Sequence, residues 1–162
     1  MELDMNRQRL ALRGAVAGFA ATRAMQGFAG TWLAIRYPAF EPHHHPLSIA
    51  RWGARKLGLT EPLPDEVATV AARVLHYGYG AFAGAVFATR VRRSLAGLYW
   101  PARGPLFAWG LWSAAFLGYI PLLGIYKWPR DWEHAERQTT LLSHTVYGLT
   151  LAVLLEVLEC NE

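Results

Sequence analysis

Two apolar segments of the chain carry one repeated motif: LHYGYGAFAGAVFA (residues 75–88) and SHTVYGLTLAVLLE (residues 143–156). The motif is His-x-x-Tyr-Gly, which starts at His76 in the first segment and at His144 in the second. Small residues follow each histidine at intervals of four, so each copy lies along one face of a helix. The repeat predicts two related helical hairpins within one chain.

The composition favours a membrane protein. Of the 162 residues, 53% are hydrophobic and 17% are charged, which is more apolar than an ordinary soluble domain. The stretches 74–89, 104–126 and 138–155 contain no charged side chain, and a helix needs roughly 20 apolar residues to cross the hydrocarbon of a bilayer. We therefore expect an all-α fold, a four-helix transmembrane bundle in a single domain (residues 1–162). The predicted spans cover residues 12–35, 69–89, 104–126 and 138–158.

The first predicted span is interrupted by two polar residues, Arg23 and Gln26. We still predict a span, because its apolar pieces together match the bilayer and a polar residue is tolerated where it faces other helices. A cleaved signal peptide is the alternative, although acidic Glu2 and Asp4 do not fit the basic first segment of such a peptide. The polar side chains expected in the bundle interior are Arg23, Gln26, Tyr79 and Tyr147.

The net charge of +4 is better explained by membrane orientation than by nucleic-acid binding, because the basic residues cluster beside apolar spans. One set of loops is rich in arginine, whereas the other set mixes basic and acidic residues. The positive-inside rule then places both termini in the cytoplasm. The arginines that decide this are Arg7, Arg9, Arg13, Arg90, Arg92, Arg93 and Arg103. The lipid bilayer is the expected partner, and no nucleic acid is expected.

This orientation puts all six histidines in the outer loops or in the outer halves of the helices. The first outer connection, residues 36–66, is rich in proline. Within it, the segment from Leu47 to Leu59 predicts a short helix that lies in the membrane interface. We expect Ile49 and Trp52 on its lipid side.

Each predicted span also carries a stripe of small residues. Helices in lipid associate through close backbone approach at such stripes and through interhelical hydrogen bonds. The expected packing glycines are Gly14 and Gly18 in the first span, Gly80 and Gly84 in the second, Gly110 and Gly118 in the third, and Gly148 in the fourth. A kink is expected at Pro121.

His76 and His144 are predicted at similar depth on two parallel helices, where paired imidazoles could hold a haem or a transition metal. Hydrogen bonding between helices and a proton-linked role are the other interpretations of this pair. Further metal ligands could come from the histidines of the outer loops, His43, His44, His45 and His134. Adjacent histidines cannot all converge unless the loop wraps the ion, so we predict no cofactor and keep haem or a metal as the alternative.

The sequence contains no signature of a known catalytic machinery. A Ser-His-Asp order, an HExxH motif, a Walker loop and a dinucleotide fingerprint are all missing. The glycine spacings are explained by helix packing. We therefore predict no catalytic residues and favour a protein that is not an enzyme.

Several short motifs occur in a characteristic order along most of the chain. They are Gly14-x-x-Ala-Gly18, His76-Tyr-Gly-Tyr-Gly80, Pro121-x-x-Gly124, Trp128-Pro129, Glu133-His134, Ser143-His-x-x-Tyr147 and Glu156. In this order the chain resembles the YagU-like inner-membrane proteins of unknown function. The resemblance implies a four-helix protein of the bacterial inner membrane and names no substrate. The first outer loop, with His43 to His45, departs from the family pattern.

The leading functional prediction is a non-enzymatic accessory or scaffolding subunit that packs against other membrane proteins or self-associates. Trp109, Trp112 and Phe116 are expected to face lipid and to make those contacts. One alternative is a redox protein that binds haem or a metal through the paired histidines. The other is a small proton-linked transporter or channel, in which Arg23 and Gln26 would line the path.

Overall fold

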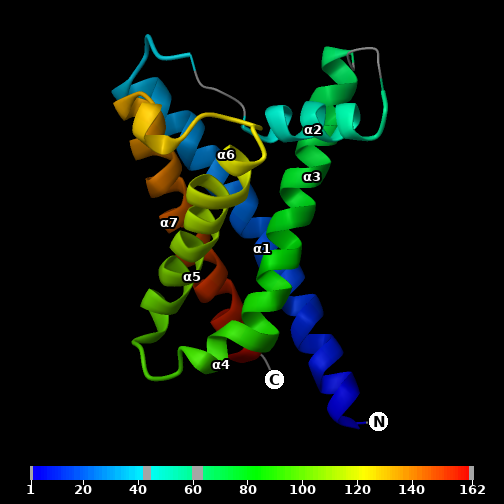
Figure 1. Ribbon diagram of the computed structural model, residues 1–162. Coiled ribbons are helices and arrows are strands. Elements are labelled where there is room, and N and C mark those ends of the chain that lie inside the picture. Colours follow the sequence, from blue (N-terminus) through cyan, green and yellow to red (C-terminus); the bar gives the residue numbers. More distant parts are fainter. Residues whose placement is uncertain (1, 42–44, 60–63, 161–162) are drawn as a thin grey trace.

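The computed structural model describes residues 2–41, 45–59 and 64–160. In these three ranges the secondary structure is helical and contains no β-strand, which confirms the all-α prediction. The long first helix α1 (Glu2–Arg36) is followed by a short helix α2 (His45–Lys56). The predicted helix in the first connection is therefore present, and it begins two residues earlier than expected (Figure 1).

The remaining helices are interrupted in two places by π-helical turns. The first of these helices is α3 (Asp65–Val86), which continues through η1 (Phe87–Val91) into α4 (Arg92–Ser94). The second is α5 (Trp100–Ala114), which continues through η2 (Ala115–Tyr119) into α6 (Ile120–Leu122). A 3₁₀ turn η3 (Pro129–Asp131) then leads into the last helix, α7 (His134–Cys160).

Two of these helical segments are long and apolar enough to cross a membrane, Trp100–Leu122 and His134–Cys160. The predicted spans 12–35 and 69–89 also lie within continuous helix. Those two segments are less apolar, since the first contains Arg23 and Gln26. The helices of the predicted bundle are thus present, and two of them meet the length and hydropathy expected of a span.

The long helices pack as a row in the order α3, α1, α7, α5. α1 lies between α3 and α7, and α5 packs on the other side of α7 (Figure 1). Side chains also connect the two outer helices of the row, since Phe87 of η1 packs on Phe107 of α5 at 5.1 Å between ring centroids. Both termini lie at one end of the molecule, and α2, α6 and the start of α7 lie at the other (Figure 1).

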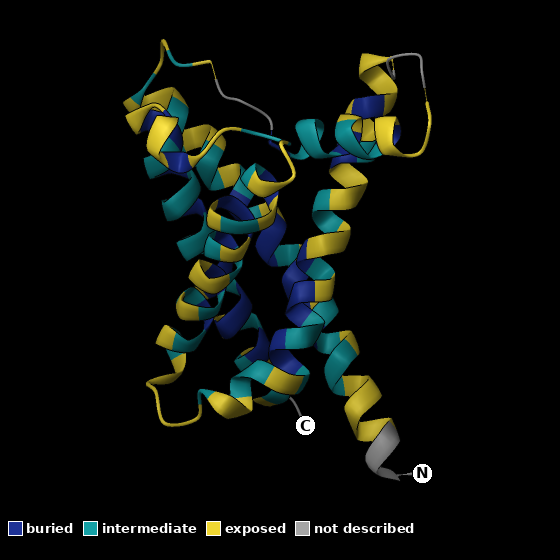
Figure 2. Cartoon of the chain, in the orientation of Figure 1, coloured by how far each residue is buried: buried dark blue, intermediate teal, exposed yellow. Residues whose placement is uncertain are grey.

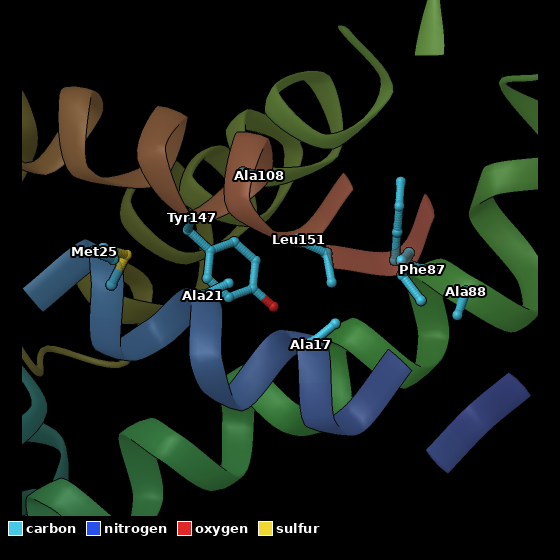
Figure 3. Packing of buried hydrophobic residues seen from close by; sticks show 9 residues of the cluster. Ala17, Ala21, Met25, Phe87, Ala88, Ala108, Tyr147 and Leu151 are labelled. Carbon is cyan, nitrogen blue, oxygen red and sulfur yellow. The ribbon is translucent and has the colours of Figure 1, made fainter. Parts of the chain in front are cut away.

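Figure 2 shows which parts of the helices are buried and which are exposed; many of the buried residues are small, and many of the exposed ones are large and apolar. Among the described residues, alanine makes up 12 of the 21 buried hydrophobic residues, whereas 26 large hydrophobic residues are exposed. The main internal cluster combines alanines of α1 with Phe87, Tyr147, Leu151 and Leu155 (Figure 3). The exposed residues on α1 and α3 include Leu12, Val16, Phe19, Val67, Val70, Val74 and Phe82.

Glycines allow the closest helix contacts. A Cβ atom on Gly18 would collide with the carbonyl oxygen of Gly80, and one on Gly84 would collide with that of Gly14. The predicted packing role of these four glycines on α1 and α3 agrees with the structure. Gly148 of α7 also meets another backbone closely, and its partner is Gly104 of α5.

The packing face predicted for α5 is wrong. A Cβ on Gly110 would have open space around it, and Gly118 approaches only the carbonyl oxygen of Ser113 in its own helix. The face that meets α7 instead carries Gly104 and Ala108, which are both buried. α5 has two stripes of small residues, and helical spacing alone does not tell which one faces a neighbour.

Two further side-chain placements differ from the prediction. Trp112 and Phe116 do not face outward, because they are buried in a second cluster with Ile120 and Trp132. Ile49 of α2 packs against the same cluster and is therefore not on a lipid-facing side. α2 thus crosses α3 (Figure 1), and Ile49 in its first half reaches the second cluster.

Candidate functional site

The two copies of His-x-x-Tyr-Gly meet in space. The hydroxyl of Tyr147 on α7 donates a hydrogen bond of 2.8 Å to the carbonyl oxygen of Gly80 on α3. Tyr147 is buried, as predicted, and its ring packs beside Ala21 and Leu151 (Figure 3). Small residues of α1 allow this contact, because they let α3 and α7 approach each other across it.

The two histidines of the motif also lie near each other. His76 lies one turn before Gly80 on α3, and His144 lies about one turn before Tyr147 on α7, so the hydrogen bond between Tyr147 and Gly80 brings the two segments together; both histidines are partly buried. The sequence prediction of paired imidazoles at similar depth is consistent with this placement. The orientation of the imidazole ring determines which of its nitrogen atoms could bind a ligand.

The ring of His144 has a defined orientation. Its Nδ1 lies 2.7 Å from the carbonyl oxygen of Thr140, one turn earlier in α7. A carbonyl oxygen can only accept, so Nδ1 carries the proton and donates, and Nε2 is left as an acceptor. Phe116 makes a T-shaped contact with the same ring, at 6.1 Å between centroids. Imidazoles that bind metals or exchange protons through Nε2 are commonly oriented in this way.

Two more tyrosines join the histidines. Tyr119 from η2 interacts with Tyr79 of α3, and Tyr79 in turn interacts with Tyr147. We call the group of His76, Tyr79, Tyr119, His144 and Tyr147 the His–Tyr site. Tyr79 was predicted to be buried, and this is wrong, since 44% of it is exposed.

The π-helical turn η2 brings Tyr119 and Phe116 to this site. Gly118 inside the turn has non-helical angles (φ −124°, ψ −112°), and Pro121 follows one turn later. Proline lacks the N–H that would bond to the carbonyl four residues earlier, so the helix must adjust there. The kink predicted at Pro121 is therefore present and centred on Gly118. Tyr119 was not predicted as a site residue from the sequence, although it lies within the Gly118-x-x-Pro121 motif that marks the kink.

The other predicted interior polar residues lie on α1. Gln26 is partly buried and accepts a hydrogen bond of 2.9 Å from the hydroxyl of Tyr77. Arg23 is exposed, so its predicted burial is wrong. Its guanidinium lies over Gly27 of the same helix, and no carboxylate pairs with it within the described ranges.

The outer histidines do not gather at one place. His134 is exposed, and its Nδ1 lies 3.2 Å from the hydroxyl of Tyr37, which also donates to Gln138 at 2.6 Å. This pair lines an open groove of about 670 Å³ with Glu41 and Glu133. His45 is buried and contacts Glu136 instead. His43 and His44 lie outside the described residues.

No group of three or more metal-ligating side chains is close together in the described part of the chain. Compared with known protein families, curated proteins and solved structures, the chain gives no match in any of the three. The resemblance to YagU-like proteins stays a prediction from the sequence.

Proposed function

We propose that the chain is a four-span integral membrane protein that works as an accessory subunit of a larger assembly. The distribution of side-chain size supports the membrane part of this proposal. A soluble bundle buries its large apolar residues, whereas this one has an alanine-rich interior and large apolar residues outside. With α3, α1, α7 and α5 as spans, both termini would lie in the cytoplasm of a bacterial inner membrane.

The observation that carries the accessory role is the exposure of Arg23. This residue lies near the middle of the predicted span 12–35, and its side chain points away from the other helices. A charged side chain at the bilayer centre costs about 3 kcal/mol on insertion scales. A partner that covers this face of α1 with a carboxylate would remove that cost.

The neighbouring residues suit a second helix. Gly27 and Gly30 are exposed on α1, and a Cβ on Gly30 would have open space around it. Small residues beside a polar one are typical of helix contacts in membranes. A second copy that used the same face would bring two guanidinium groups together, so a different chain with an acidic residue at mid-depth fits better.

The size of the native complex tests this proposal. Mild extraction followed by blue-native electrophoresis should give a species larger than the protomer for the natural protein. Arg23→Leu should reduce it to the protomer, whereas Arg23→Lys should keep it. Arg130→Leu is the matched control, because Arg130 is exposed outside the predicted spans. A natural protein that migrates only as a lone protomer would refute the accessory role.

The convergence of two histidines and three tyrosines favours a second candidate, a proton-linked role of the His–Tyr site. Ionisable groups within a membrane segment commonly mark proton or substrate paths. Protein in liposomes with an imposed pH gradient should then dissipate it, and the double change His76→Phe with His144→Phe should abolish the flux. Equal flux in both samples would exclude this role.

The same two histidines carry the haem or metal alternative. With Nδ1 of His144 donating to Thr140, its Nε2 is an acceptor and has the character of a ligand atom. An absorption spectrum and elemental analysis of the purified protein distinguish this alternative from proton transfer. A Soret band or a bound metal that disappears in His144→Phe would support it.

A further inference from the structure

His45 lies inside a box of three aromatic rings. Its imidazole stacks on Trp132 at 4.9 Å between centroids, with an interplanar angle of 24°. Phe116 and Tyr126 make T-shaped contacts with it, at 5.0 and 4.7 Å between ring centroids. Only 8% of His45 is exposed, so the rings and their neighbours cover almost all of it.

A buried carboxylate completes the box. Glu136 is 3% exposed, and its Oε1 lies 3.3 Å from Nε2 of His45. The hydroxyl of Tyr126 donates to the same oxygen at 3.0 Å. A phenol is a neutral donor at neutral pH, so Tyr126 can hold this bond to the carboxylate. We call Phe116, Tyr126, Trp132 and Glu136 together the aromatic box.

A second basic side chain, that of Lys127, lies near Glu136 and Tyr126. Nζ of Lys127 lies 3.9 Å from Oε2 of Glu136 and 5.6 Å from the centre of the Tyr126 ring. Aromatic faces and a carboxylate attract cations together, the rings through their quadrupole and the acid through its charge. The chemistry of the aromatic box is therefore that of a site for a positively charged group.

The walls of the aromatic box do not depend on α2. Its four residues come from η2, α7 and the connection between them. The indole N–H of Trp132 donates to the carbonyl oxygen of Lys127 at 3.0 Å, and Trp112 packs against the other face of the cluster. The aromatic box would thus persist if His45 moved away.

α2 itself is anchored on the other side of the molecule. It crosses and contacts α3 (Figure 1), with Ala50 and Ala54 buried, and Arg51 pairs with Asp65 at 2.5 Å. Only its first turns reach the aromatic cluster, through His45 and Ile49. The imidazole of His45 therefore occupies the aromatic box, although the helix to which it belongs, α2, packs mainly against α3.

We propose that the aromatic box is a binding site for an organic ammonium group and that His45 is its built-in competitor. Three rings around a cation with a carboxylate at the base is the arrangement that recognises substituted ammonium groups. Such a group could belong to a soluble amine or to a lipid headgroup. Binding would displace His45 and so free the first turn of α2 from the α5 side.

The test measures tetramethylammonium binding by calorimetry on the full chain in detergent micelles. His45→Ala should bind it at least about tenfold more tightly than the natural protein, because the competitor is gone. Glu136→Gln in the His45→Ala background should lose this binding. 3,3-Dimethylbutanol, a neutral molecule of similar shape, should not bind to His45→Ala.

A second variant keeps the test decisive if His45→Ala does not fold. Ile49→Ala weakens the hold of α2 on the cluster and leaves every residue of the aromatic box in place, so it should also tighten tetramethylammonium binding. Equal binding of the ammonium and its neutral analogue, or no gain in either variant, would overturn the proposal.

Two further experiments distinguish a soluble amine from a lipid headgroup as the source of the ammonium group. Choline is titrated into His45→Ala in micelles, and the same variant is placed in nanodiscs with phosphatidylethanolamine or with phosphatidylglycerol only. Choline binding in micelles supports a soluble amine. Loss of tetramethylammonium binding in phosphatidylethanolamine nanodiscs, but not in phosphatidylglycerol nanodiscs, supports a headgroup that already occupies the aromatic box.

Discussion

Tyr147 and Gly80, which belong to different copies of the repeated motif, are joined by a hydrogen bond of 2.8 Å between α7 and α3. The contact links the first half of the chain to the second. Its acceptor is the carbonyl oxygen of Gly80, which belongs to the backbone of helix α3. Thr22 of α1 lies directly against Gly80, so any side chain at that position would collide with it. The tyrosine of one copy and the glycine of the other are therefore needed together.

Tyr147→Phe should lower the stability of the folded protein by about 1 kcal/mol, because it removes this buried hydrogen bond and leaves the ring in place. Thermal unfolding in detergent, followed by circular dichroism, measures the change. Tyr99→Phe is the control, since 75% of that residue is exposed. Equal stability of the natural protein and Tyr147→Phe would show that the bond contributes nothing.

Gly148→Ala should destabilise the protein by about 1–3 kcal/mol, because the added methyl group would overlap the backbone at Gly104 and force α5 away from α7. Gly110→Ala is the matched control on α5. It has open space around it and should be neutral or stabilising, because alanine favours the helix. Chemical unfolding of the two variants gives the comparison, and the reverse ranking would contradict the packing of α5 on α7.

Helical periodicity predicted the elements well and the contact face of α5 badly. On α1 and α3 the glycines lie mainly along one face of each helix. Gly18 and Gly84 could therefore be placed in the contact between α1 and α3 from their spacing alone. On α5 two stripes compete, and bulky side chains flank both, so the choice of Gly104 depends on how α7 is placed. That placement is a tertiary property, which local spacing does not contain.

The His–Tyr site was predictable in part for the same reason. His76 and His144 share a motif, so the predicted duplication of a hairpin also predicts that they lie near each other. Tyr119 belongs to a π-helical turn that shifts its direction, and regular spacing does not describe such a turn. The contact of His45 with Glu136 depends on the path of the first connection, which the sequence does not define.

Arg92→Gln should reduce stability by about 1 kcal/mol, since Arg92 of α4 lies 2.7 Å from Glu159 and 3.8 Å from Glu156 on α7. The pair joins the end of the first half of the chain to the C-terminal turn. A double-mutant cycle with Glu159→Gln, measured by unfolding in low salt, isolates the interaction. Arg93→Gln should have little effect because Arg93 is exposed. Additive effects of the two single changes would mean that the ion pair is not formed.

Cys160 offers a direct test of the proposed orientation, because it is the single cysteine of the sequence and is exposed at the end of α7. If both termini are cytoplasmic, a membrane-impermeant maleimide added to intact spheroplasts should leave Cys160 unlabelled until the membrane is permeabilised. Leu57→Cys in a Cys160→Ser background provides the opposite case, since Leu57 is 84% exposed in the first outer connection and should be labelled without permeabilisation. Both termini lie at one end of the molecule (Figure 1), which fits an even number of membrane crossings. The first connection follows one crossing, so Leu57→Cys and Cys160 should lie on opposite sides of the membrane and differ in labelling. Labelling of both positions in intact cells would mean that the exposed apolar faces of α1 and α3 do not carry the chain across the bilayer.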